Sequence, residues 1–254
     1  MNMSVDTATY IEQMAAIERS FASAAGLADR GDYKIFYSHV HRFPLLLLGM
    51  NPGGTPGAAS AGLSASPTSY CENWEHDFVC FRNEPRYRMA GPVFSFLCQV
   101  LGTNEVRNIR QIPATNVGFR RSQNTNGINP RTLAREASST LKQLLVIVDP
   151  ALVLFLSKGA FDTFQQLHCD QVADRCDDGV FTRNGRSPAE IYTHCTATLA
   201  CTGNRIRLVS VGHPSKYAGR SEWPRVVERV RLEMHLRCEN LPFLPTIPDL
   251  PDHR

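Results

Sequence analysis

Two asparagines and a histidine stand at or just after apolar runs of this sequence, where buried strands would end. Asn51 follows the run LLLLGM, Asn116 lies near the end of IPATNV, and His213 follows IRLVSVG. An amide side chain offers both a donor and an acceptor to the edge of a polar ring. An asparagine can also orient a water, and a histidine can stabilise a developing anion. These three residues are the first candidates for a site that holds a planar polar ligand.

The glycine-rich stretch LLLLGMNPGGTPG, Leu45 to Gly57, does not have the features of a phosphate-binding loop. A P-loop ends in Gly-Lys-Ser/Thr, and a dinucleotide fingerprint opens a helix. Here no lysine follows, and Pro52 and Pro56 stand where the helix would begin. The loop is therefore predicted to place the amide of Asn51 beyond a buried strand.

Four apolar runs and the segments between them predict an α/β fold. The strands are expected at Pro44–Gly49, Ile112–Val117, Ala151–Leu156 and Ile206–Val211, and helices at Pro92–Leu101, Pro130–Val148, Ser157–Leu167 and Glu222–Arg237. Continuous apolar runs alternating with helices are typical of parallel strands that are buried on both faces. Ligands of such sheets bind beyond the carboxyl ends of the strands. We therefore expect a three-layer α/β domain with its site at that edge.

Some segments do not fit this pattern. Residues 1–30 predict an amphipathic helix, Gly54–Ser69 is a loop of small residues, and the proline-rich tail 240–254 is expected to lie extended over the surface. The segment Gln171–Asn204 has few core signals and is expected to form an excursion with short strands of its own. A length of 254 residues is compatible with one core, so we expect a single domain from Met1 to Arg254.

Composition constrains the class of protein. The net charge is +3, and four of the 27 basic residues are lysines. Arginine suits phosphate oxygens, but codon composition of the source genome equally explains its abundance. No apolar run is long enough to span a bilayer, and acidic residues near the start argue against a signal peptide. We expect a cytoplasmic protein that acts without a membrane.

Eight cysteines without a secretory signal predict reduced thiols. His168 and His194 each precede a cysteine, which leaves metal binding open. The cysteine spacings lack the tight pairs of structural zinc sites, so buried, inert cysteine is the preferred interpretation. We expect no metal and no other cofactor.

Four short motifs, in order, resemble the uracil-DNA glycosylase superfamily. They are GMNPG after the first strand, ATNV at the second, FLSKGAFDTF at the third and HPS after the fourth, and they extend over roughly Phe43 to Arg220. The resemblance implies a central four-stranded, mainly parallel sheet with helices on both sides. It also implies hydrolysis of the bond between uracil and deoxyribose in a nucleotide flipped out of DNA, which leaves an abasic site.

The resemblance also assigns roles to the strand-end residues. Asn51 would orient the attacking water, and His213 would lie beside the uracil oxygen that gains negative charge. We expect these two residues to face each other from neighbouring strands. Asn116 would read the uracil edge, with Gly49 and Met50 forming part of the pocket wall.

Gly53 occupies the fifth position of the first motif, where branches strict for uracil carry a tyrosine that blocks a 5-methyl group. The chain is in this respect similar to the single-strand-selective monofunctional and mismatch-specific branches. We therefore expect 5-substituted uracils, such as 5-hydroxymethyluracil, to fit. Relatives place a stacking phenylalanine soon after the first motif, where this chain has AGLSA. Tyr70 is the candidate for that role, and Phe78 is the alternative.

The residues after HPS are expected to contact DNA. Ser215, Lys216 and Arg220 would bind phosphates, and Tyr217 would fill the space that the flipped nucleotide leaves. Two further departures from the family, besides the missing phenylalanine, are evident. Lys216 stands where a proline is common, and no cysteine follows Asn116 closely, so the iron–sulfur cluster of one branch is not expected. The expected partner is uracil-containing DNA, single- or double-stranded, and the expected state is a monomer.

Structural roles remain possible for each of these residues. Asn-Pro is a common turn pair, Asn116 could cap the next segment, and Arg120 and Arg121 could lie in a solvated loop. Two other functions also remain open. The chain could hydrolyse a different N-glycoside, such as a free nucleoside or a modified base in RNA, or it could bind uracil without catalysis.

Overall fold

The computed structural model describes residues 7–27, 33–50, 76–85, 87–121, 129–183 and 186–238, with 178–183 and 186–191 described by their backbone. The helices are α1 (Thr7–Ala24), α3 (Asp77–Cys80), α4 (Ala90–Leu101), α5 (Val106–Arg110), α6 (Pro130–Val148), α7 (Lys158–His168), α8 (Pro214–Tyr217) and α9 (Trp223–Arg237). The strands are β1 (Leu45–Gly49), β2 (Ala114–Asn116), β3 (Leu152–Phe155), β4 (Cys169–Arg183), β5 (Arg186–Leu199) and β6 (Arg205–Val211).

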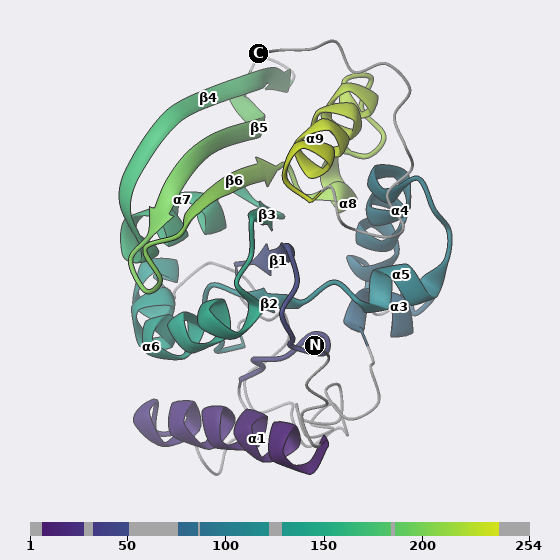
Figure 1. The fold of residues 1–254 in the computed structure, drawn as a ribbon. Helices are drawn as coiled ribbons and strands as arrows, with labels where there is room; N and C mark the ends of the chain where they lie inside the picture. The colour runs from purple at the N-terminus through teal and green to yellow at the C-terminus, as the bar shows by residue number, and fades with distance from the viewer. Residues whose placement is uncertain are drawn as a thin grey trace.

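The strands form one sheet in the order β2-β1-β3-β6-β5-β4 (Figure 1). The first four are parallel, while β5 runs antiparallel to both of its neighbours. The α/β class and the four predicted strands are thus confirmed, but the sheet has six strands in the described chain rather than four. The segment 171–204 forms the long strands β4 and β5 of this sheet, so the prediction of a separate excursion with short strands is wrong.

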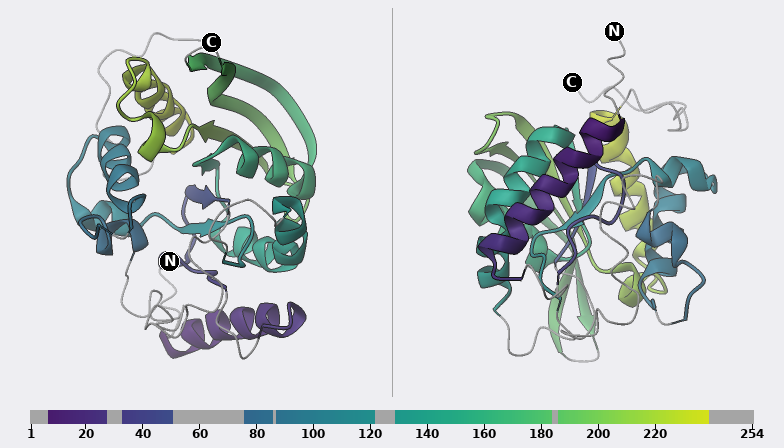
Figure 2. Two further views of the ribbon diagram at one scale, coloured as in Figure 1. Left: turned by 180° about the vertical axis from the view of Figure 1, so that it is seen from behind. Right: turned by 90° about the horizontal axis from the view of Figure 1, so that it is seen from below.

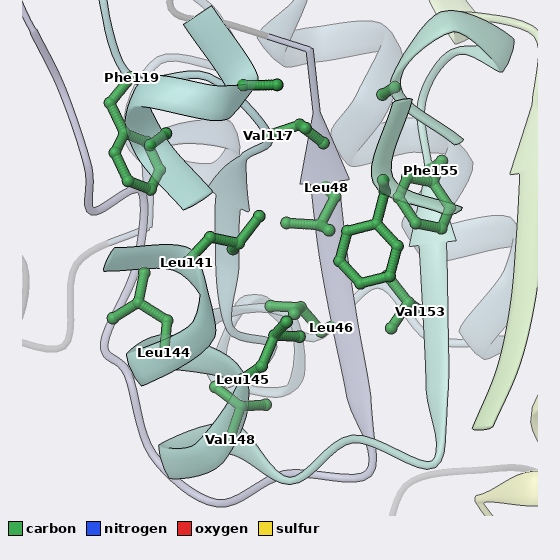
Figure 3. Close-up of a cluster of buried hydrophobic side chains, with 14 of the residues drawn as sticks. Leu46, Leu48, Val117, Phe119, Leu141, Leu144, Leu145, Val148, Val153 and Phe155 are labelled. Atoms are coloured by element: carbon green, nitrogen blue, oxygen red, sulfur yellow. The ribbon is translucent and has the colours of Figure 1, made fainter. Parts of the chain in front are cut away.

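Helices cover both faces of the sheet and give three layers (Figure 2). The apolar residues of β1 divide between these layers because successive side chains of a strand point to opposite faces. Leu46 and Leu48 pack in the cluster that includes α1, α6 and α7, as Figure 3 shows for α6. Leu45 and Leu47 pack in the cluster that includes α4 and α9. The four consecutive leucines are therefore the sequence of a strand that is buried on both faces.

The helix boundaries follow local signals. Asn129 caps α6 by accepting a hydrogen bond from the Arg131 N–H, and Pro130 opens the helix. Ser157 caps α7 in the same way through the Ala160 N–H. The predicted helix Pro130–Val148 is confirmed residue for residue, and the other predicted helices lie within two residues of the observed bounds, apart from the N-terminal helix, which is shorter than the range expected.

A partly buried ion pair fixes α9 to the sheet. Arg207 of β6 binds both carboxylate oxygens of Glu233, at 2.8 Å from Nε and 2.5 Å from Nη2. His194 of β5 lies 3.4 Å from the same carboxylate. The Arg207 and Glu233 side chains are 12% and 9% exposed, so neither charge is well solvated. This carboxylate therefore joins three elements: α9, β6 and β5.

We expect Glu233→Ala to lower the free energy of unfolding by about 3–5 kcal/mol, because it leaves the Arg207 charge buried without its partner. Glu228→Ala is the matched control: it removes the i,i+3 pair with Arg231, whose glutamate is 65% exposed, and should cost less than about 1 kcal/mol. Urea unfolding of the two variants measures both values. Equal losses would show that the Arg207–Glu233 pair does not fix α9.

Candidate functional site at the carboxyl edge of the parallel strands

The carboxyl ends of β2, β1, β3 and β6 meet at one edge of the sheet. Gly49 of β1 is aligned with Asn116 of β2. Leu48 of β1 is aligned with Phe155 of β3, which is aligned with Ser210 of β6. The residues that follow these positions therefore emerge side by side. This places Gly49, Met50, Asn116 and the segment from His213 at the edge where α/β sheets bind ligands.

Gly49 and Asn116 approach each other very closely. A Cβ atom at residue 49 would lie 2.1 Å from Oδ1 of Asn116, so glycine is required for this contact. Asn116 is 6% exposed, and its amide nitrogen is buried without a hydrogen-bond partner in the described part of the chain. Buried amides normally find partners. The Asn116 amide is thus held in place with an unused donor.

Tyr37 lies near this amide and belongs to a group of polar side chains with Lys34 and Asp77. Lys34 and Asp77 form a buried ion pair, with Nζ 2.6 Å from Oδ1, and Lys34 Nζ lies 4.5 Å from the centre of the Tyr37 ring. Burial raises the pKa of Tyr37, and a hydrogen-bonding effect of the Asn116 side chain opposes that rise. Tyr37 is therefore close to Asn116. The sequence analysis did not identify Lys34, Tyr37 or Asp77, because none of them follows an apolar run.

Met50 connects three of the segments at this edge. Its carbonyl oxygen accepts a 2.8 Å hydrogen bond from the Gly118 N–H, so the chain segments after β1 and β2 continue side by side. Its Cε would lie 3.1 Å from a Cβ at Gly159, in the first turn of α7. Its side chain also packs partly buried against the core. Met50 thus fills the space between the ends of β1 and β3.

His213 is held by the start of α8. Its Nδ1 accepts a hydrogen bond from the Ser215 N–H at 3.2 Å and lies 2.8 Å from Ser215 Oγ. Its Nε2 is buried and has no partner among the described residues. Burial lowers the pKa of His213 to about 4, and Lys216 contributes in the same direction. The imidazole is therefore neutral at pH 7, and because Nδ1 accepts, Nε2 carries the proton as an unused donor.

The other residues predicted after His213 lie on or beside α8. Ser215, Lys216 and Arg220 are exposed, as phosphate-binding side chains would have to be. Tyr217 is partly buried and packs against the apolar cluster that includes α4 and α9. Its ring therefore rests on the core in this structure.

Asn51, Gly53 and Tyr70 lie outside the described residues. The alternative stacking residue, Phe78, is in α3 and packs partly buried against the same cluster as Tyr217. The expectation that Asn51 and His213 follow neighbouring strands is wrong, because β3 lies between β1 and β6. Two strand spacings of about 4.8 Å separate β1 from β6.

The histidines next to cysteines have different surroundings. His194 contacts the Tyr192 hydroxyl and Glu233. His168 is buried, and both of its ring nitrogens are without a hydrogen-bond partner among the described residues. Over these residues no group of three or more His, Cys, Asp or Glu side chains is arranged to hold a metal. The described helices include none that is long and apolar enough to cross a membrane.

A hollow of about 400 Å³ lies elsewhere, between the carboxyl end of α4 and Arg231 of α9. Arg231 there binds Glu228 and the Gln99 carbonyl oxygen, and burial raises the pKa of the Cys98 thiol, which also lines the hollow. Comparison of the sequence with models of known protein families gives no match, and no curated protein sequence matches it. The site must therefore be interpreted from its own geometry.

We expect Gly49→Ala to destabilise the protein by about 1–3 kcal/mol, as overpacking does, because the new methyl group meets Asn116 Oδ1. The double variant Gly49→Ala/Asn116→Ala should recover most of that loss, since the second change removes the atom in collision. Gly219→Ala, where a Cβ meets nothing within 4 Å, is the control and should change stability by less than about 0.5 kcal/mol. Thermal unfolding measures all three. An additive double variant would contradict the close contact.

Proposed function

We propose that this protein is a DNA glycosylase that hydrolyses the N-glycosidic bond of uracil, or of a 5-substituted uracil, flipped out of DNA. One observation carries the proposal: two buried donors, Asn116 Nδ2 and His213 Nε2, have no partner among the described residues and lie at the same edge of the parallel strands. An unsatisfied buried donor costs about 1–3 kcal/mol. A ligand with carbonyl oxygens on two sides of a planar ring would satisfy both.

Uracil has that arrangement of acceptors. In the proposed complex Asn116 binds the edge of the ring that carries N3 and O4, where its amide offers both a donor and an acceptor. His213 donates to O2. As the glycosidic bond breaks, O2 gains negative charge, and a donor fixed in advance stabilises that charge; a single such donor contributes about 2.7–4 kcal/mol in known enzymes.

Hydrolysis of the glycosidic bond also needs a water molecule that attacks the sugar. We assign its orientation to Asn51, which follows Met50 at the end of β1. An amide cannot accept the proton as a carboxylate does, so the reaction depends on the cationic character of the sugar rather than on general-base catalysis. Ser215 and Lys216 on α8 and Arg220 just after it are exposed and would bind the phosphates of the flipped strand.

The decisive test is incubation of the protein with an oligonucleotide that contains one uracil, followed by alkali to cut abasic sites. We expect cleavage by the wild type and a loss of at least about 100-fold for His213→Ala, with Asn51→Ala also slower. An oligonucleotide containing 5-hydroxymethyluracil should be cut too, because Gly53 presents no side chain to C5.

The outcomes separate the alternatives. Cleavage of uracil with complete rejection of the substituted base would overturn the role of Gly53. Retention of uracil-containing DNA without cleavage would identify a binding protein. Activity on free nucleosides with little dependence on salt would identify a different N-glycoside hydrolase, because phosphate contacts make DNA binding sensitive to salt.

The same assay, carried out over a range of pH, tests the protonation state of His213. The pKa of His213 is lowered to about 4 by burial, so the neutral donor persists well below the pKa of about 6.5 of a free histidine. We expect single-turnover rates to be constant from pH 8 to about 5 and to fall as the pH approaches 4, because a protonated Nδ1 can no longer accept the hydrogen bond from the Ser215 N–H that holds the ring. A loss of rate centred near pH 6.5, absent in the residual activity of His213→Ala, would contradict a buried neutral imidazole.

A further inference from the structure

His39 and His41 lie on a short segment at the amino ends of the parallel strands. This segment follows Ser38, whose Oγ accepts a hydrogen bond from the Ala114 N–H at the start of β2, and it leads to Leu45, the first residue of β1. It is therefore at the opposite edge of the sheet from the candidate site. Side chains two residues apart in an extended segment point to the same side, and the two imidazole rings are in contact.

Tyr10 of α1 fixes this segment. Its hydroxyl donates a 2.7 Å hydrogen bond to the Val40 carbonyl oxygen and accepts one of 3.0 Å from the Val40 N–H. Val40, between the two histidines, is 2% exposed and packs in the core. The Tyr10 ring also stacks on the His39 ring, with their centres 4.6 Å apart and their planes inclined by 17°. The positions of the two imidazoles are thus set by α1 and by the core.

The two rings approach each other through their Nδ1 atoms, which are 3.3 Å apart. This distance is longer than the length of about 2.7–3.2 Å that is typical of hydrogen bonds from N–H groups to oxygen. Two nitrogen ligands of a tetrahedral zinc ion, each about 2.0–2.1 Å from the metal, are about 3.3–3.4 Å apart. Adjacent nitrogens of a square-planar site would be about 2.9 Å apart. The separation of the two Nδ1 atoms therefore matches one edge of a tetrahedral zinc site.

The orientation of the two rings supports the same interpretation. The ring centres of His39 and His41 are 5.1 Å apart, and the ring planes are inclined by 58°. A nitrogen lies about 1.2 Å from the centre of its imidazole ring, so two rings that point at one tetrahedral zinc ion have centres about 5.2 Å apart. A linear hydrogen bond over the same nitrogen separation would place the centres about 5.6 Å apart. The two Nδ1 atoms thus converge on a common point beside the line that joins them.

Both imidazoles are in the protonation state that metal binding requires. Burial lowers the pKa of His39 to about 4, with His41 contributing in the same direction, and burial also lowers the pKa of His41. Neutral imidazole is the form that binds metal ions. His39 is 8% exposed, whereas His41 is partly exposed, so the pair can be reached from the side of His41. Among the described residues no third His, Cys, Asp or Glu is arranged to join the pair, which leaves the other coordination positions to water.

We propose that His39 and His41 bind one Zn²⁺ ion through their Nδ1 atoms, with water molecules at the remaining tetrahedral positions. The inference does not rest on the proposed function, because the two histidines lie at the opposite edge of the sheet from the candidate site. The ion joins the residues on either side of Val40 and so acts as a clasp on the segment that enters β1. Because it binds the folded chain and not the unfolded chain, it stabilises the protein increasingly as its concentration rises.

The test is titration of the protein with Zn²⁺, followed by calorimetry and by NMR of ¹⁵N-labelled histidine side chains. The exposed residues Cys80 and Cys176 are replaced by serine in every protein, so that their thiolates do not compete for the metal. In this parent protein we expect saturation at one Zn²⁺ per chain, with shifted Nδ1 resonances of His39 and His41. His41→Ala should weaken binding at least about tenfold, since the loss of even an outer-shell partner costs about 10–100-fold.

The matched control is His235→Ala, which removes a partly exposed histidine from α9 and should bind Zn²⁺ as the parent protein does. Tyr10→Phe keeps the stacked ring but removes the hydroxyl that holds Val40, and it should weaken binding less than His41→Ala. Equal losses in His41→Ala and His235→Ala would overturn the site, as would zinc-dependent shifts confined to other histidines. The absence of saturable binding would show that a proton alone bridges the two rings. The Nδ1 shifts are measured on the intact pair, so they decide the question even where a variant fails to fold.

Discussion

The structure depends on the burial of β1 between two apolar layers. Leu45, Leu46, Leu47 and Leu48 are each at most 1% exposed, and they alternate between the two core clusters. A strand buried on both faces must have neighbours on both edges as well, since its backbone groups have no water to bind. The pairing of β1 with β2 and β3 satisfies this requirement. It also fixes the level at which the three strands end, and that level is where Gly49, Met50 and Asn116 lie.

The same packing explains how the site tolerates unsatisfied polar groups. Asn116 and His213 each carry a buried donor without a partner within the described residues, and each donor costs about 1–3 kcal/mol. Because the free energy of unfolding of a protein is small, unpaired buried donors that lower it are expected at sites where a bound ligand pairs with them. The Gly49 contact on one side and the Ser215 contact on the other prevent these side chains from turning away. The core therefore supports a preorganised, unpaired arrangement of donors.

Sequence patterns predict the parallel half of the sheet well and the antiparallel half poorly, for a physical reason. β1 and β3 are continuous apolar runs and β6 is largely apolar because both faces are covered, and the capping signals of Asn129 and Ser157 mark the helices α6 and α7. In β4, residues 171–177 are exposed, so its sequence is mostly polar and lacks that signal. Its place in the sheet is set by pairing with β5, a non-local contact that a local pattern does not encode.

The residues of the candidate site likewise differ in whether sequence patterns predict them. Its strand-end residues Asn116 and His213 were predictable because each terminates or follows a buried run. The Lys34–Asp77 pair and Tyr37, which lies near the Asn116 amide, come from segments without such a run. Their proximity arises because the chain from Lys34 to Ser38 runs beside β2, with hydrogen bonds such as Lys34 N–H to the Phe119 carbonyl. Only the tertiary structure brings them together.

The electrostatic character of the site is consistent with an anion that forms during a reaction rather than one bound beforehand. The donors at the strand ends are an amide and an imidazole that burial keeps neutral, with a pKa of about 4. Neutral donors bind a neutral pyrimidine weakly and its developing anion more strongly, and this difference in binding would be the source of the proposed catalysis. The proposed chemistry thus uses two donors that carry no formal charge.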